Sequence, residues 1–208
     1  MDFRWALMLL VAIALVWSGV APFDRATWWL EVAPVLIAAP LLLASARRFP
    51  LTPLLYALIA AHALILIVGG HYTYARVPLG HWAQEWFGFA RNHYDRLGHF
   101  AQGFEPAILA RELLLRRTPL RRGGWLFLLA TACCLAFSAF YELVEWWTAL
   151  LAGDGATDFL ATQGDPWDTQ WDMFLALIGA SAAVTLGAWL QDRQMRSALG
   201  PTKSQPLN

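Results

Sequence analysis

Charged residues are scarce in this sequence. Only 14% of its 208 residues are Asp, Glu, Lys or Arg, whereas 58% are hydrophobic; a soluble domain carries about 25% charged and about 45–50% apolar residues. The 15 basic side chains balance the 15 acidic ones, which excludes a nucleic-acid-binding protein that depends on bulk positive charge. The same composition excludes a disordered chain and indicates a membrane protein.

Cysteines and signal motifs are nearly absent as well. Cys133 and Cys134 are adjacent within an apolar run, so we expect them to be packing residues and not part of a disulfide framework. No nucleophilic serine or cysteine motif indicates acyl transfer, and no internal repeat supports an inverted-repeat transporter. Residues 1–10 lack a basic segment followed by a small-residue cleavage site, which predicts a retained first span instead of a removed signal peptide.

Long apolar runs predict an all-α, polytopic membrane helix bundle. A helix needs about 20 mostly apolar residues to cross the hydrocarbon core. Six segments fit: residues 5–21, 28–46, 51–70, 93–115, 125–151 and 171–189. The fourth is the least apolar, yet it has the length and apolar spacing of a helix. We expect one transmembrane helical domain over residues 1–199 and a disordered cytoplasmic tail over residues 200–208.

The distribution of basic residues predicts the orientation of this bundle. Basic residues gather in short cytoplasmic loops. One set of connections holds 11 of the 15, namely Arg4, Arg47, Arg48, Arg111, Arg116, Arg117, Arg121, Arg122, Arg193, Arg196 and Lys203. The alternate set holds only Arg25, Arg76, Arg91 and Arg96. This split requires an even number of spans and places both termini in the cytoplasm.

Three pairs of ionisable residues stand at helical spacing near the outer ends of spans four, five and six. They are Asp95 with His99, Glu142 with Glu145, and Asp168 with Asp172. Spacings of three or four residues put both members of a pair on one helix face. One member of each pair is 17 residues from an inner-boundary marker, Arg116, Trp125 or Trp189, or about 26 Å along a helix. The pairs are therefore expected to reach a common depth beneath the outer boundary. Glu31, near the start of the second span, is expected to face the outer headgroup region.

These carboxylates cannot all stay ionised together without a compensating cation. Three interpretations are open: acids exposed at the water interface, a structural network with Arg91 and Arg96, or a metal or catalytic site. Carboxylates and imidazole suit a divalent ion such as Zn, Mg or Mn. The expected metal ligands are Asp95, His99, Glu142, Asp168 and Asp172.

An outward-facing, metal-assisted enzyme is the first functional hypothesis, because a metal polarises a phosphoryl or carbonyl oxygen and activates water. Glu145 is the candidate general base, with Asp95 beside it in the catalytic set. The substrate would be lipid-linked or part of the cell envelope. Residues expected to contact it are Trp146, Trp147, Trp167, Trp171, His71 and Arg91. Membrane lipid is the other expected partner, and nucleic acid is not expected as a partner.

Two other hypotheses use the same residues. In one, the acidic pocket binds a cation, a proton or a cationic amphiphile for transport, and Glu105 in span four continues the path inward. In the other, the polar cluster only fixes helix packing. His62, in the middle of span three, is expected to be a satisfied core histidine, and Glu105 a hydrogen-bonded structural acid.

Four longer motifs stand out in the sequence: residues 71–78 (HYTYARVP), 91–104 (RNHYDRLGHFAQGF), 139–147 (AFYELVEWW) and 162–174 (TQGDPWDTQWDMF). Together they resemble the YjdF-like family of bacterial inner-membrane proteins. This resemblance covers about residues 51–193 and implies a multi-pass protein of the bacterial inner membrane with six spans. The order of the three ionisable pairs is also similar, more distantly, to the VanZ-like family, although Glu145 stands where that pattern usually has glutamine.

Overall fold

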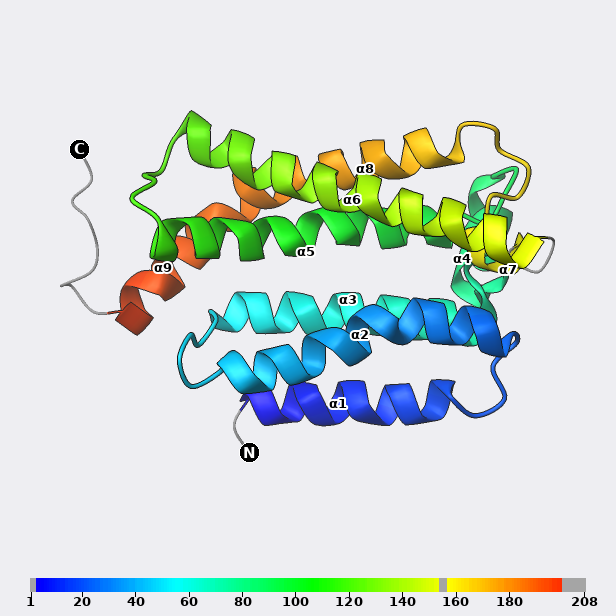
Figure 1. Ribbon diagram of the computed structural model, residues 1–208, viewed down its shortest axis with the longest axis horizontal. Helices are drawn as coiled ribbons and strands as arrows, with labels where there is room; N and C mark the ends of the chain where they lie inside the picture. The colour runs from blue at the N-terminus through cyan, green and yellow to red at the C-terminus, as the bar shows by residue number, and fades with distance from the viewer. Residues whose placement is uncertain (1–2, 154–156, 200–208) are drawn as a thin grey trace.

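The computed structural model describes residues 3–153 and 157–199, and their regular structure is entirely helical, as the sequence predicts (Figure 1). The long helices are α1 (Phe3–Ser18), α2 (Arg25–Ser45), α3 (Pro53–Tyr72), α5 (Tyr94–Arg117), α6 (Gly124–Ala152) and α8 (Asp168–Ala182). A short π-helical segment, η3 (Ala183–Gly187), joins α8 to α9 (Ala188–Leu199). The short elements are η1 (Tyr74–Arg76), α4 (Pro78–Phe87) and α7 (Thr157–Leu160). The expected tail, residues 200–208, lies outside the described residues.

The long helices run side by side along one axis, and α5 lies at the centre of the bundle (Figure 1). α5 packs against α3 on one side and against α6 and α8 on the other, while α1 and α2 both pack against α3. The start of α1 and the end of α9 lie at the same end of the bundle. The α2–α3 and α5–α6 connections lie at that end too. The basic residues in and beside these connections are Arg47, Arg48, Arg116, Arg117, Arg121 and Arg122.

Four of these helical segments are long and apolar enough to cross a membrane: Arg25–Ser45, Pro53–Tyr72, Gly124–Leu151 and Asp168–Ser197. Only 28% to 33% of each segment is buried, so most of their apolar side chains cover the outside of the bundle, as a lipid solvent requires. α1 is apolar but has 16 residues. α5 has 24 residues, about 36 Å at 1.5 Å per residue, but carries many charges. The count of six spans stays a prediction.

Glycine lets α5 and α8 approach each other closely. A Cβ atom on Gly103 would fall on the backbone carbonyl of Ala176, and one on Gly179 would fall on the carbonyl oxygen of Phe100. Small residues allow membrane helices to pack this tightly. The contact brings the polar face of α5 against the first turns of α8.

A polar network closes the end of the bundle that holds the termini. The buried Glu112 carboxylate accepts hydrogen bonds from Thr52 Oγ1 (2.8 Å) and Arg116 Nη1 (2.6 Å). Arg111 donates to Gln191 Oε1 and to Asp192 Oδ1, each at 2.7 Å. These bonds join the start of α3 to α5 and α5 to α9. The charged side chains at this end therefore find their hydrogen-bond partners within the protein.

At the opposite end of the bundle, the observed helices differ from the expected ones in two places. α1 ends at Ser18 and not near residue 21, because Trp28 Nε1 donates to Ser18 Oγ (3.0 Å) and the chain then turns into α2. Within the expected loop 71–92, α4 forms between Pro78 and the left-handed Gly88 (φ 68°). Leu79, Trp82 and Trp86 on α4 are exposed, which is typical of a helix lying in the membrane interface.

Candidate functional site

Two residues of α5 form the first part of the candidate site. Asp95 and His99 are one turn apart on the same buried face, 7% and 6% exposed. The imidazole Nε2 atom lies 3.5 Å from Asp95 Oδ1. Because α5 is surrounded by α3, α6 and α8, these polar groups face the interior of the bundle and not lipid.

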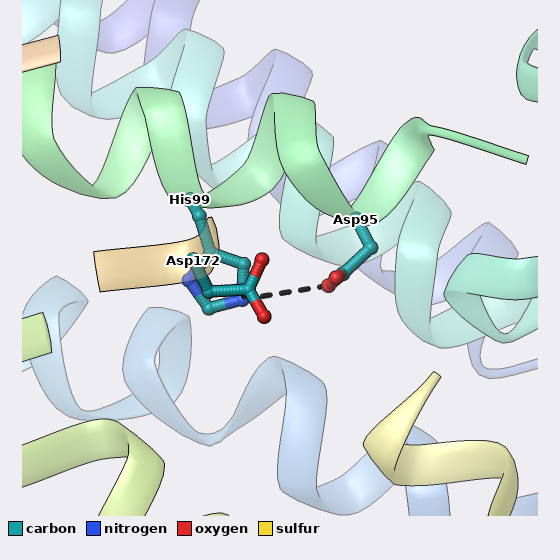
Figure 2. A group of neighbouring side chains, drawn as sticks. All are labelled: Asp95, His99 and Asp172. Carbon is teal, nitrogen blue, oxygen red and sulfur yellow. Dashed lines mark ion pairs between the residues drawn. The ribbon is translucent and has the colours of Figure 1, made fainter. Parts of the chain in front are cut away.

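The neighbouring helices direct three more carboxylates at the same imidazole. Asp172 of α8 places Oδ1 3.9 Å from His99 Nε2, and Glu142 of α6 places Oε1 3.9 Å from His99 Nδ1. One ligand atom each from Asp95, His99 and Asp172 lie within 4.8 Å of one another, as do those of His99, Glu142 and Glu145. Figure 2 shows Asp95 and Asp172 converging on His99 from separate helices. We call these five residues the carboxylate–imidazole cluster.

Three carboxylate oxygens of the cluster have no hydrogen-bond partner although they are buried. They are Asp95 Oδ2, Glu142 Oε1 and Asp172 Oδ1, on side chains that are each nine-tenths or more buried. A buried polar atom without a partner is costly, and a buried charge more so. The cluster therefore presents acceptor oxygens from α5, α6 and α8 toward one another around the His99 imidazole.

Gln102, one further turn along α5, orients the imidazole. Its Oε1 atom lies 3.0 Å from His99 Nδ1. This contact on Nδ1 holds the ring so that Nε2 faces Asp95 and Asp172. Histidine ligands of metals use such a bond on the second nitrogen to set tautomer and orientation. Gln102 was not among the predicted residues; its spacing of three from His99 was the available signal.

Glu31 is buried beside the cluster and does not face the headgroups, which corrects the expectation from sequence. Its side chain is only 4% exposed, it hydrogen-bonds with Tyr74, and it lies near enough to Asp95 and His99 for their charges to act on it. The missing side chain of Gly70 lets α3 approach the Glu31 Cβ atom. Because hydropathy does not report which side of a helix is buried, Glu31 looked like a boundary residue.

Asp168 and Arg91 belong to a second group, one turn nearer the end of the bundle opposite the termini. Arg91 Nη1 binds Asp168 Oδ1 at 2.7 Å, and Arg96 Nη2 binds Asp165 Oδ2 at 2.9 Å. We call these four residues the ion-pair layer. Asp168 was predicted as a metal ligand and Arg91 as a substrate contact. In the structure they are instead paired with each other, with Asp168 in the first turn of α8 and Arg91 in the connection before α5.

His93 stands next to the ion-pair layer, just before α5. Burial lowers the pKa of its imidazole, and the positive charges of Arg96 and Arg91 lower the pKa further. A histidine with a lowered pKa is neutral at pH 7. His93 therefore adds no positive charge to this end of the bundle at neutral pH, and Arg91 and Arg96 are left to balance Asp165 and Asp168.

The structure places His71 away from the cluster. Its Nδ1 atom lies 3.0 Å from the carbonyl oxygen of Ser18, and its ring packs on Trp17 with centroids 4.4 Å apart. His71 thus fastens the end of α3 to the end of α1. Its predicted role in substrate binding rested only on its position along the helix axis. That position does not say toward which side of the bundle the side chain points.

The four tryptophans expected to contact substrate, Trp146, Trp147, Trp167 and Trp171, are all exposed on the outside of the bundle. Arg96 lies over the Trp171 ring, 5.1 Å from its centroid, so this tryptophan also covers the ion-pair layer. Their predicted contact with substrate stays a prediction.

Comparisons with known proteins identify the family. The family described as "Predicted membrane protein (DUF2238)" matches residues 3–193. The chain belongs to this family. The inner membrane protein YjdF of Escherichia coli (strain K12) is 54% identical over 188 residues, 90% of each chain. The YjdF-like resemblance is thus confirmed, and with it a multi-pass protein of the bacterial inner membrane.

The comparisons give no support to the more distant VanZ-like resemblance, and no solved structure matches this DUF2238 protein. Membership in the DUF2238 family describes a membrane protein and states no reaction. The chemistry of the carboxylate–imidazole cluster must therefore be argued from its own geometry.

Proposed function

We propose that this DUF2238 protein binds a divalent metal ion in the carboxylate–imidazole cluster and uses it as an outward-facing, metal-assisted enzyme. One observation carries the proposal. Buried carboxylate oxygens from α5, α6 and α8 surround a single imidazole, and three of them lack any hydrogen-bond partner. A cation between them would satisfy these acceptors at once.

Charge balance supports this proposal. Within the described part of the chain, no arginine or lysine forms an ion pair with Asp95, Glu142 or Asp172, because Arg91 and Arg96 are engaged by Asp165 and Asp168. Several carboxylates are thus left with one imidazole. Such a group is tolerated in a bundle interior only when a cation or protons neutralise it, and a divalent ion supplies two charges in one position.

The donor set favours a borderline ion. Imidazole suits Zn, whereas carboxylates suit Mg and Mn, so a mixed set such as His99, Asp95 and Asp172 fits Zn²⁺ or Mn²⁺ best. Glu145 is less buried than Glu142 and is the candidate general base for a metal-bound water. The substrate class is a lipid-linked or envelope molecule with a phosphoryl or carbonyl group, which a metal polarises.

Metal content of the purified protein tests the proposal. The protein in detergent is exchanged into chelator-treated buffer and supplied with Zn²⁺ or Mn²⁺, and bound metal is measured by mass spectrometry of the element. We expect about one ion per chain. Asp95→Asn, His99→Ala and Asp172→Asn should each lower the affinity about 10–100-fold or more, since even outer-sphere partners of a metal contribute that much.

Glu85→Gln is the matched control for these variants. Glu85 is an exposed acid on α4 at the same end of the bundle, so its loss changes the net charge equally but leaves the cluster intact. It should bind metal like the parent. Metal-free parent protein whose thermal unfolding does not respond to added divalent ions would overturn the proposal and leave a packing role for the cluster.

Movement of a proton or cation is a second candidate, favoured by one pair of residues. His62 Nδ1 of α3 lies 3.2 Å from Glu105 Oε2 of α5, and Glu105 follows His99 and Gln102 at spacings of three. Acidic and histidine side chains in such series mark proton relays in membrane proteins. Flux into proteoliposomes that disappears in Glu105→Gln supports this candidate; absence of flux under any imposed gradient rejects it.

A further inference from the structure

A large apolar cavity lies between α1, α2 and α3, in the half of the bundle that holds the termini. Its volume is about 840 Å³, within the range of ligand-binding sites in proteins. α1 and α2 each pack against α3 but make few contacts with each other. The cavity occupies the space between these two consecutive helices, on the opposite side of α3 from α5 and the carboxylate–imidazole cluster.

The sequence of α2 explains why this space is open. Pro34 and Pro40 interrupt the helix, and a proline inside a helix removes a backbone hydrogen bond and bends it; α2 is visibly bent in Figure 1. Around the bend the walls are lined with small residues, including Ala12, Ala38, Ala39 and Ala60. Short side chains facing one another leave a volume that these helices do not fill.

The cavity has the length of one membrane leaflet. On α1 its lining runs from Arg4 to Leu15, which is about 16 Å at 1.5 Å per residue. The hydrocarbon core is about 30 Å thick, so the cavity covers about half of that thickness. It starts at the end where the basic residues gather.

Two arginines stand at that end of the lining, whereas the rest is almost wholly apolar. They are Arg4 at the start of α1 and Arg47 just after α2. An apolar volume with positive charge at its membrane-surface end is complementary to an anionic amphiphile. Basic pockets between membrane helices on the cytoplasmic side bind anionic lipid headgroups.

We propose that this cavity is a binding site for an anionic phospholipid of the adjacent leaflet. One acyl chain would lie between α1 and α2 against the alanine-lined wall, and the phosphate would lie between Arg4 and Arg47. This site is independent of the metal proposed for the cluster, since the two are on opposite sides of α3.

Lipid binding to the intact, purified protein tests the site. Delipidated protein in detergent is mixed with phosphatidylglycerol or, separately, phosphatidylcholine with the same acyl chains, and retained lipid is counted by native mass spectrometry. We expect phosphatidylglycerol to be retained preferentially and to raise the thermal unfolding temperature. The double variant Arg4→Gln/Arg47→Gln should lose about tenfold or more in phosphatidylglycerol affinity, since each arginine contributes to binding the anionic headgroup.

Two further variants make the result decisive. Arg48→Gln/Arg121→Gln removes two charges at the same end, at residues outside the cavity lining, and should retain phosphatidylglycerol like the parent. Ala39→Trp fills the cavity and should exclude both lipids. Equal retention of the two lipids, or unchanged retention in Arg4→Gln/Arg47→Gln, means adventitious lipid only and overturns the proposal. Conversion of a dimer to a monomer by Ala39→Trp means that a second copy fills the space, and also overturns it.

Discussion

Two acids one helical turn apart, Asp168 and Asp172, have different surroundings at the start of α8. Asp168 is bound by Arg91 at 2.7 Å, whereas Asp172 has an oxygen without a hydrogen-bond partner. Both are aspartates at helical spacing, and the sequence alone treats them as equivalent. The difference arises because Arg91 comes from a loop more than 70 residues earlier in the chain.

This contrast yields a prediction with an internal control. Asp172→Asn should abolish stoichiometric metal binding while leaving the ion-pair layer intact. Asp168→Asn should keep the metal and lower the thermal unfolding temperature, because it leaves the partly buried Arg91 guanidinium with a weakened partner. Element analysis and unfolding of both variants are measured side by side. Loss of metal in both, or in neither, contradicts the separation of the two groups.

Asp24 offers a second residue-scale prediction, this time with a pH dependence. Its Oδ1 accepts a hydrogen bond from the Thr27 backbone N–H (2.6 Å) at the start of α2, and this bond lowers the pKa of the carboxyl below its ordinary value of 3.8. A lowered pKa means that the charged form stabilises the fold. This stabilisation is full above the ordinary pKa and is lost as the pH falls through the lowered pKa.

Asp24→Ala should therefore cost about 1 kcal/mol at neutral pH, the usual contribution of an N-cap. The measurement is thermal unfolding in detergent at neutral pH and through the acid range. Asp24→Asn keeps a capping oxygen but cannot titrate, so it should retain most of the stability and show a flatter response below about pH 4. If Asp24→Ala unfolds at the parent temperature at neutral pH, the cap contributes nothing.

At the scale of elements, α5 is both the least apolar long helix and the central one. Its buried face carries Asp95, His99 and Gln102 near one end and Arg111 and Glu112 near the other. Contacts with α3, α6 and α8 shield these groups from lipid. A helix with protein neighbours on both sides needs little lipid-facing surface, and so its low hydropathy is consistent with a central position.

The α5–α8 contact predicts a strong effect of single methyl groups. Gly103→Ala and Gly179→Ala would each drive a Cβ into a backbone carbonyl of the facing helix, which cannot move aside as a flexible side chain can. We expect destabilisation of about 1–3 kcal/mol, as for overpacked cores, and weaker metal binding because Asp172 would shift away from His99. The readouts are unfolding temperature and metal affinity.

Gly124→Ala is the control for this prediction. Gly124 begins α6, and an added Cβ there meets no atom within 4 Å. The substitution should leave stability unchanged or raise it, because alanine is the better helix former. Equal unfolding temperatures for all three variants would show that α5 and α8 are not packed as closely as the structure has them.

Some elements could be predicted from the sequence and others could not. The long apolar runs located every long helix, and the less apolar segment 93–115 became α5 because its length and spacing are helical. α4 was missed although Pro78 and Gly88 are signals for the start and end of a helix, because the segment between the spans was treated as a loop. The π-helical segment η3 and the extension of α9 to Leu199 have no comparable proline or glycine signal in the sequence.

At the scale of the whole molecule, the shared position of the termini gives a test of orientation. The described chain starts and ends at the same end of the bundle, where most basic residues also lie (Figure 1). Since basic loops stay in the cytoplasm, this end should face inward. The carboxylate–imidazole cluster, near the other end, would then lie toward the outer face.

Reporter fusions check this orientation. Green fluorescent protein attached to either terminus should fluoresce in bacterial cells, and alkaline phosphatase attached there should be inactive, because each reporter works on only one side of the inner membrane. Alkaline phosphatase inserted within α4, at the opposite end, should be active. An active phosphatase at either terminus contradicts the inward orientation of that end, and activity at one terminus only contradicts an even number of crossings.

The sequence by itself determined the membrane environment, the helical class and the common level of the ionisable pairs along their helices, because hydropathy and helical rise depend only on the order of residues. Only the tertiary structure decided which of these groups meet. It brings together Asp95, His99, Glu142, Glu145 and Asp172. It pairs Asp168 with Arg91 and places His71 against Ser18. It also places Glu31 and Gln102 beside the cluster. The physical reason is that depth along a helix is a local property, whereas the side on which a residue finds its partner is set by how separate helices pack.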